Sequence, residues 1–433
     1  MNHDLNIAAL AVVSACVLIW GLVSARLERW DVSAPIAFVI LGLAVTHGPT
    51  TLVHVKLHSS TILSLAEVTL ALVLFADASR VNVRALRTDA ALPARLLGIG
   101  LPLTIGAGAG AAALLFGGNG LWVAAAIGAI VAPTDAALGA SIMGDTRVPS
   151  GVRRLLNVES GLNDGIATPF VNLFIAGAVS AEAVSGVHPA TAAVDLLGGA
   201  GLGIAVGVLG ATVLALAGRR GWSAVGFRPI AVLALAVFAY SVSVAAGTNG
   251  FIAAFVAGMA FGTVDQAKGV DLRFTEEVGT LLSLLVWFMF GAAMLAPGLA
   301  EVGWRDVVFA LLALTVLRMV PVALALAGSG LDRATVGFVG WFGPRGLASV
   351  VFGLIAVDSL APAQSKVVLG AVTLTVALSV LLHGISASPL AARYGALVQH
   401  LHPERPEHTD SAPISTRTLR GARPGAGRPG ATG

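Results

Sequence analysis

Long apolar stretches alternate with short polar ones along almost the whole chain. Many of the apolar stretches reach about 20 residues, the length that an α-helix needs to cross the hydrocarbon core of a bilayer. The polar stretches between them are short and rich in Arg, Gly and Pro. The pattern predicts an all-α polytopic membrane protein with about thirteen transmembrane helices, at residues 5–25, 34–54, 59–79, 93–116, 119–143, 152–178, 192–217, 229–246, 249–264, 276–296, 305–327, 334–357 and 366–390.

Two of these segments contain residues that interrupt helices. The fifth reads "AIVAPTDAALGA" around Pro133, and the twelfth reads "WFGPRGLAS" around Pro344. Proline removes a backbone donor and clashes with the preceding turn. If segments 1–6 and 8–13 are two inverted six-helix repeats, the two interruptions fall at equivalent positions. Paired broken helices of this kind are the best sequence pointer to a transport site.

The composition excludes a soluble globular protein. Hydrophobic residues make up 56% of the chain and charged residues only 11%, whereas a soluble domain carries about 25% charged residues. The 52 glycines suit membrane helices that pack with their backbones close together.

Basic residues are distributed unevenly between the loops. Fifteen Lys and Arg residues lie in the loops after odd-numbered segments and only three, Lys56, Arg305 and Lys366, in the loops after even-numbered ones. Because positive loops stay on the cytoplasmic side, we expect a multi-pass protein of the cell (plasma) membrane with its N-terminus outside and its C-terminus in the cytoplasm. Residues 1–395 are expected to form one transmembrane domain.

The Pro-, Gly- and Arg-rich residues 396–433 are expected to form a disordered cytoplasmic tail. We expect its arginines to contact anionic lipid. No nucleic-acid partner is expected.

Beyond the first turn of each predicted span, seven charged residues lie inside the spans. A charge at the bilayer centre costs at least about 2.5–3.5 kcal/mol, so such residues are paired or functional by default. At about 1.5 Å per residue, most of them fall in one layer near the midplane. The seven are Glu67, Asp77, Asp135, Glu159, Asp164, Arg318 and Arg345.

Four polar residues of the sixth segment form two stripes in "LNVESGLNDG". Residues four apart share a helix face, so Glu159 and Asn163 make one stripe and Ser160 and Asp164 the other. An anion and an amide suit pairing with a buried arginine. A hydroxyl and a carboxylate are hard oxygen ligands that suit a small cation. The alternative is that all four only satisfy one another in a packed core.

The interruptions carry complementary charges. Broken helices expose partial positive N-terminal ends and partial negative C-terminal ends. Asp135 at one break and Arg345 at the other are placed to compensate them, and freed carbonyls near Thr134 are candidate cation ligands. Irregular backbone at this depth is tolerated only inside protein or beside water.

Together these motifs resemble the monovalent cation–proton antiporter family that includes NhaP-type sodium/proton exchangers. The strings "PTDAA", "NVESGLNDG", "GFIAAFVAGMAFG", "LRMVPV" and "GPRGLASVV" occur in the family's order, and the resemblance covers nearly all of residues 5–395. It implies an inverted-repeat bundle with crossed broken helices, a mobile core domain and a dimer domain, usually in a homodimer. The activity it implies is transport, with no enzyme chemistry and no cofactor.

The resemblance also implies roles for individual residues. Asp164 would bind a proton or the cation in turn, with Ser160 and the Thr134 backbone as further ligands. Asn163 before it would mark the electroneutral branch of the family, and an acid of the third span, Asp77 or else Glu67, would lie near the site. The charge network would consist of Glu159 paired with Arg318, and of Asp135 and Arg345 serving the broken helices.

The expected function is antiport of protons against Na+ or K+ for pH and ion homeostasis. Burial favours a protonated carboxyl and a nearby cation favours the ionised form, so one carboxylate with two competing ligands couples the two fluxes. A cation channel or solute symporter of similar architecture is the main alternative. An intramembrane aspartyl protease using Asp135 and Asp164 is a remote one. The ligand set does not choose among Na+, K+ and Li+.

Overall fold

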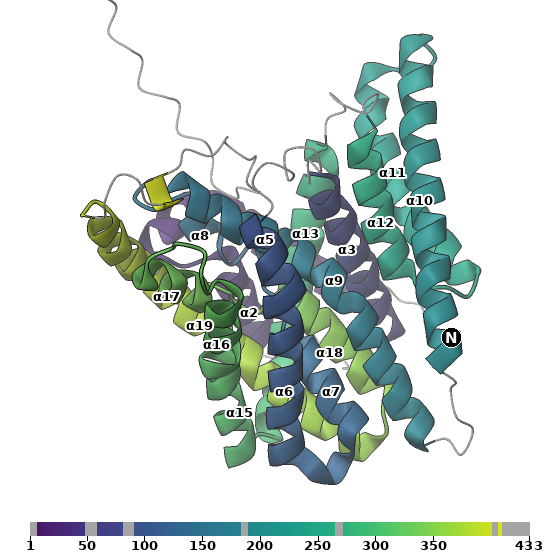
Figure 1. The fold of residues 1–433 in the computed structure, drawn as a ribbon. Helices are drawn as coiled ribbons and strands as arrows, with labels where there is room; N and C mark the ends of the chain where they lie inside the picture. The colour runs from purple at the N-terminus through teal and green to yellow at the C-terminus, as the bar shows by residue number, and fades with distance from the viewer. Residues whose placement is uncertain are drawn as a thin grey trace, which may run out of the picture.

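A computed structural model describes residues 7–47, 59–80, 91–182, 189–264, 272–400 and 406–408 of the chain. Within these ranges the regular structure is entirely helical (Figure 1). The first half consists of α1 (Ile7–Leu27), α2 (Ala34–His47), α3 (Ser60–Ser79), α5 (Ala91–Arg95), α6 (Leu101–Phe116), α7 (Leu121–Ile130), α8 (Ala140–Met143), α9 (Ser150–Glu182) and α10 (Pro189–Arg219). The second half consists of α11 (Arg228–Ala245), α12 (Gly250–Thr263), α13 (Arg273–Met289), α14 (Ala296–Ala300), α15 (Trp304–Leu314), α16 (Val316–Ala325), α17 (Arg333–Trp341), α18 (Leu347–Ser359) and α19 (Pro362–Val398).

Each predicted span corresponds to one helix or to a run of consecutive helices. In the described part of the chain, 9 helical stretches are long and apolar enough to cross a membrane. The other four predicted spans correspond to the shorter apolar helices Ala34–His47, Leu121–Ile130, Gly250–Thr263 and Leu347–Ser359. The prediction of an all-helical polytopic protein is confirmed.

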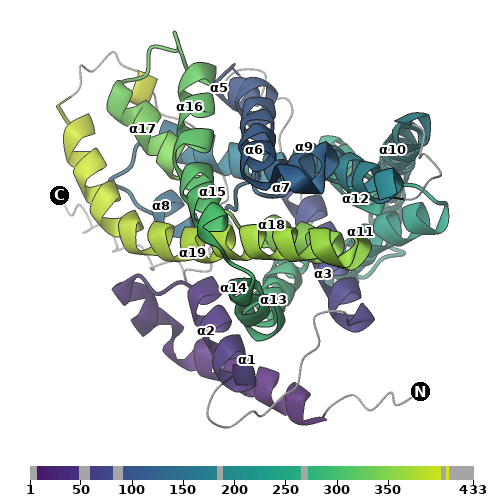
Figure 2. The same ribbon diagram turned by 90° about the horizontal axis from the view of Figure 1, so that it is seen from below.

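The helices form two groups, which Figures 1 and 2 show from two directions. In one group, α10, α11 and α12 pack together, and α12 also packs on α3. The α13 helix lies between α3 and α2 and contacts both. In the other, α7 packs against α6 and α9, and α19 runs past α15, α17 and α18. The α3, α9, α12 and α18 helices connect the two groups through their mutual contacts.

Glycines allow the helices at this junction to approach closely. A Cβ atom on Gly258 or Gly262 of α12 would lie 2.3 Å from a backbone carbonyl oxygen of α3, that of Phe75 or Ser79 respectively. Such a distance is a clash, so only glycine permits this crossing. This is the small-residue packing that the composition predicts for membrane helices.

The fourth, tenth and eleventh spans are less regular than the continuous segments predicted. Wide π turns at Leu96–Gly100 and Phe290–Leu295 interrupt the fourth and tenth, and Thr315 separates α15 from α16. In the tenth, a Cβ atom on Gly291 would lie 2.1 Å from the carbonyl oxygen of Val39, so the turn lies where α2 crosses. The π turn of the tenth span therefore coincides with close packing between distant segments, and the sequence pattern does not show such packing.

The end of the chain is partly described. The α19 helix continues to Val398, slightly past the predicted end of the transmembrane domain. A short 3-10 turn, η7 (Pro406–His408), then packs near α9. Residues 401–405 and 409–433 of the predicted tail lie outside the described residues.

Candidate functional site: a buried polar cluster between two broken helices

The two predicted interruptions are present and touch each other. Residues 131–139 separate α7 from α8, and residues 342–346 separate α17 from α18. The residue before a proline is pushed out of the helical conformation, and Ala132 and Gly343 hold that position. The Asp135 amide donates to the carbonyl oxygen of Pro344 at 2.8 Å, so one break supplies a hydrogen-bond partner to the other.

Asp135 caps the second half of the opposite broken helix. One carboxylate oxygen accepts from the amide of Leu347, the first residue of α18, at 2.9 Å. The other accepts from the Ala137 amide at 2.6 Å. A carboxylate at a helix N-terminus satisfies an orphan amide and the positive end of the dipole.

Two glycines leave room for these contacts. A Cβ atom on Gly346 would lie 2.0 Å from a carboxylate oxygen of Asp135. A Cβ atom on Gly343 would lie 2.6 Å from Nε of Arg318 and 2.9 Å from the Thr134 methyl group. A side chain at either position would therefore displace a polar residue of the site.

Arg345 ties three irregular segments together. Its side chain is 1% exposed. One guanidinium nitrogen donates to the carbonyl oxygen of Ala132 at 2.8 Å, beside the first break, and the other to that of Ala313 at 3.0 Å, just before the bend at Thr315. These carbonyls lie where helices end or bend and so lack regular helical partners. The arginine neutralises the partial negative charge that they present.

The stripe residues of α9 face the first break. The Thr134 hydroxyl lies 3.1 Å from the Ser160 hydroxyl and accepts from the Asn163 side-chain amide at 2.5 Å. All three residues are buried. Thr134 therefore joins the two stripes that the sequence separates, and Asn163 bonds this hydroxyl where the sequence suggested pairing with an arginine.

Asp164 completes this cluster on the α9 side. It is buried at 9% exposure, one helical turn beyond Ser160. The next residue, Gly165, has no side chain, and a Cβ atom there would overlap the Phe255 ring of α12. The aromatic ring thus packs directly over the α9 backbone beside Asp164 and excludes bulk water from that side.

Of the two acids in the third span, the structure brings Asp77 to α9. Its Cβ atom lies 3.9 Å from the position that a Cβ atom on Gly161 would take. Glu67 lies ten residues earlier on α3, about 15 Å along the helix, and its carboxylate accepts from the Tyr240 hydroxyl at 3.1 Å. Glu67 is therefore not part of the cluster around Thr134.

Glu159 and Arg318 form a buried ion pair. Two N–O contacts join the groups, at 2.6 and 2.9 Å, and both side chains are 2% exposed. The bidentate geometry suits a guanidinium and a carboxylate. The pair connects α9 to α16 beside the break, so the negative charge of Glu159 is matched by a cation.

The comparisons with known proteins agree with this arrangement. The model of the family described as sodium/hydrogen exchanger, transmembrane, matches residues 12–393. The chain belongs to this family. Sodium/hydrogen exchangers related in sequence include a probable Na+/H+ antiporter of Schizosaccharomyces pombe, 28% identical over 249 residues, and Na+/H+ antiporter 2 of Zygosaccharomyces rouxii, 27% identical over 256 residues.

These relatives are much longer proteins. The matched regions are 53% and 54% of this chain but only 32% and 31% of the relatives. The chain therefore matches about a third of the length of these relatives.

Solved exchanger structures share the fold. The sodium proton antiporter MjNhaP1 from Methanocaldococcus jannaschii at pH 8 superposes with a TM-score of 0.71 at 18% identity, covering 90% of this chain and 99% of that one. A second MjNhaP1 structure, from electron microscopy, gives 0.70 at 19% identity, covering 93% and 100%. The predicted likeness to NhaP-type exchangers is confirmed for the fold.

Three further residues make hydrogen bonds at or beside the breaks. The Ser349 hydroxyl of α18 donates to the carbonyl oxygen of Ile130 at 2.7 Å, at the end of α7. On α19, Ser379 accepts from the Arg345 amide at 2.7 Å, and His383 lies 2.8 Å from the carbonyl oxygen of Trp341. From the sequence, His383 late in the thirteenth span is expected to pack or to contribute to pH dependence, and the two serines are not marked. Two are serines with backbone partners on other helices, and such partners have no sequence signal.

Proposed function

We propose that this protein is a secondary active antiporter that exchanges protons for a monovalent cation, Na+ or K+, across the cell membrane. The observation that carries the proposal is the cluster of Thr134, Ser160, Asn163 and Asp164 against a helix break. The Thr134 and Ser160 hydroxyls and the Asn163 amide lie within hydrogen-bond distance, and the buried Asp164 follows Asn163 on the same helix. The printed activity of the relatives, Na+/H+ antiport, supports the same reaction.

We assign Asp164 as the group that binds the proton and the cation in turn. Glu159 is paired with Arg318, and both carboxylate oxygens of Asp135 accept hydrogen bonds from backbone amides. Those two acids serve the architecture. Asp164 has Ser160 on its own face and Thr134 beyond it, which is a ligand set for a small hard cation.

Exchange follows from competition at this carboxylate. Burial favours its protonated form while the site holds no cation, and a bound cation favours the ionised form. If the helices change their opening only when one of the two is bound, each proton leaving is matched by one cation entering. One carrier acid then moves no net charge, and the exchange is electroneutral.

The protease alternative needs two carboxylates that share a proton. Both carboxylate oxygens of Asp135, however, already accept hydrogen bonds from the Leu347 and Ala137 amides. A homodimer in the plasma membrane, acting in pH and ion homeostasis, remains a prediction from the resemblance.

The test is proton movement in proteoliposomes, read with a pH-sensitive dye after addition of Na+, K+ or Li+. Asp164→Asn should abolish the cation-dependent signal, because an amide neither releases a proton nor offers a negative charge to the ion. Asp195→Asn is the matched control, since Asp195 is an exposed acid on α10 and its loss should leave exchange unchanged. Retained exchange in Asp164→Asn would refute the assignment. Clamping the membrane potential should not change the wild-type rate if exchange is electroneutral.

A further inference from the structure

The α19 helix presents three polar side chains to the break between α17 and α18. Ser379, His383 and Ser386 lie on one face of the helix, at spacings of four and three residues. The Trp341 ring nitrogen donates to the Ser386 hydroxyl at 2.9 Å. The same tryptophan ring stacks on the His383 ring, with centroids 5.1 Å apart and the planes at 23°.

His383 and Ser379 together hold both sides of the interruption. Before the break, Nε2 of His383 lies 2.8 Å from the carbonyl oxygen of Trp341, the last residue of α17. After the break, the Arg345 amide donates to the Ser379 hydroxyl at 2.7 Å. Nδ1 of His383 lies 3.2 Å from this hydroxyl and 2.9 Å from the Ser379 carbonyl oxygen.

The two protonation states of His383 need different hydrogen bonds here. A neutral ring has one N–H. When Nε2–H donates to Trp341, Nδ1 must accept, and the Ser379 hydroxyl is its donor. A doubly protonated ring donates from both nitrogens, and carbonyl oxygens already lie 2.8 and 2.9 Å away. Adding a proton to Nδ1 therefore forms a bond to the Ser379 carbonyl and releases the hydroxyl that also accepts from Arg345.

The charged groups around the ring oppose one another. Positive charge acts on it from Arg345 and from Arg318 of α16. Two acids, Glu28 and Asp31, lie in the turn between α1 and α2 and line the same cavity as His383.

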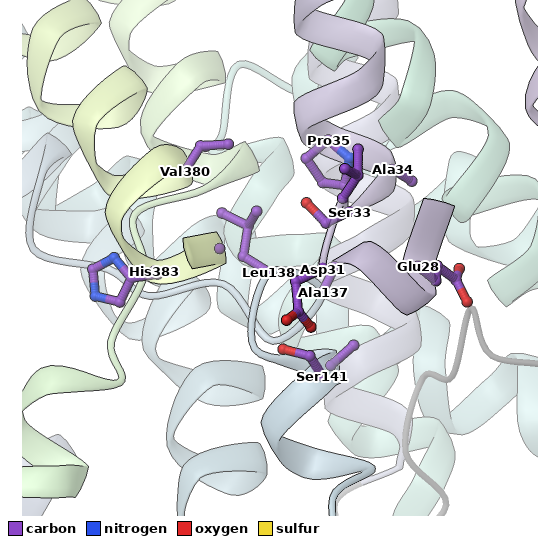
Figure 3. A pocket seen from close by; sticks show the side chains of 13 residues that line it. Glu28, Asp31, Ser33, Ala34, Pro35, Ala137, Leu138, Ser141, Val380 and His383 are labelled. Atoms are coloured by element: carbon purple, nitrogen blue, oxygen red, sulfur yellow. The ribbon is translucent and has the colours of Figure 1, made fainter. Parts of the chain in front are cut away.

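A cavity lies against this part of α19, and Figure 3 shows the His383 ring at its edge, apart from the acids Glu28 and Asp31. Its volume is about 60 Å³, and one water molecule needs about 10–15 Å³. Val380 and His383 line it from α19, Ser33 from the start of α2, and Leu138 and Ser141 from the segment after the first break. The cavity therefore has room for water between α19 and the segment after the first break.

We propose that His383 is a positioning residue whose protonation rearranges the hydrogen bonds at the α17–α18 break and so sets the pH dependence of transport. The effect passes from Nδ1 to the Ser379 hydroxyl and to the Arg345 backbone. The Arg345 side chain bonds Ala132, two residues before Thr134. The inference rests on the proposed exchange function, but it assigns a separate proton that is not transported.

The first experiment compares exchange rates in proteoliposomes from about pH 5.5 to 8.5, the range in which histidine titrates. His383→Gln keeps a polar side chain of similar reach but cannot titrate. We expect it to retain exchange at alkaline pH and to shift or flatten the acid limb of the profile by about one pH unit. Ser379→Ala should move the same limb, and the double variant should show no further shift. His400→Gln, at the end of α19, is the control and should match the wild type.

A second measurement uses the wild-type protein and does not depend on a variant at His383. A protonated imidazole quenches a stacked indole, so Trp341 fluorescence should fall as the pH is lowered through the titration. The chain has 7 tryptophans, and Trp341→Phe identifies the contribution of this one.

Three outcomes separate the possibilities. A shifted profile with a Trp341 titration supports the proposal. Superimposable profiles for His383→Gln and wild type, or no pH-dependent Trp341 signal, overturn it. A wild-type protein that titrates at Trp341 but shows no cation-dependent proton movement contradicts the exchange function and leaves the titration of His383 standing.

Discussion

At the residue scale, the site depends on charges that are buried only because they have partners. The sequence singled out Glu159 and Arg318 as charges inside spans, and the structure joins them at 2.6 Å with both side chains 2% exposed. A buried pair contributes little net stability, but removing one partner leaves an uncompensated charge in a medium of low dielectric constant. This asymmetry makes the pair testable.

Glu159→Gln should lower the free energy of unfolding by about 3–5 kcal/mol, because Arg318 loses its counter-ion. Thermal unfolding in detergent measures the change. Glu301→Gln is the control, since Glu301 forms an exposed pair with Lys366 at 3.1 Å and such pairs contribute about 0–1 kcal/mol. Equal losses in the two variants would show that the buried pair is not structurally important. The double variant Glu159→Leu/Arg318→Met should recover much of the loss.

At the element scale, the decisive feature is that two helices are interrupted in mid-span and that each supplies hydrogen-bond partners to the other's interruption. Pro133 and Pro344 indicated both breaks from the sequence. The partners at the breaks were not visible there: Asp135 caps α18, Arg345 bonds Ala132 and Ala313, and Ser349 bonds Ile130. Irregular backbone inside a bilayer needs every one of these bonds, because no solvent replaces them.

Gly346→Ala should disrupt this arrangement, because the new methyl group would lie 2.0 Å from a carboxylate oxygen of Asp135. We expect exchange to fall by at least tenfold and stability to drop by about 1–3 kcal/mol, as overpacking does. Gly337→Ala is the matched control on α17, where a Cβ atom meets nothing within 4 Å. Dye-based exchange and thermal unfolding of the two variants give the comparison, and normal transport in Gly346→Ala would argue against a fixed cap.

At the scale of the whole molecule, the helices carry their connections to two opposite ends. Figure 1 shows the turn between α6 and α7 at the lower end, and the turn between α10 and α11 at the upper end. The α10–α11 turn carries Arg219, Arg220 and Arg228, whereas the α6–α7 turn reads "GGNG" without charge. The positive-inside rule assigns the arginine-bearing end to the cytoplasm.

Cysteine labelling tests this orientation. The native Cys16 is 5% exposed, so it adds little background. In right-side-out vesicles a membrane-impermeant maleimide should label Gly118→Cys and not Ser223→Cys, and the pattern should reverse in inverted vesicles. Labelling of Ser223→Cys from outside would invert the topology that the loop charges predict.

The sequence alone determined the number and position of the spans, the two interruptions and the identity of the buried charged residues. Each of these follows from local physics: a segment's apolar length, the missing amide of proline, and the cost of a charge in lipid act on one stretch at a time. Only the tertiary structure decided the partners. It placed Asp77 rather than Glu67 beside α9, bonded Asn163 to Thr134, and brought His383 to the break. Such pairings depend on how distant helices cross. Many of them end on a backbone carbonyl, which every residue has, so the sequence does not mark which carbonyl is bonded.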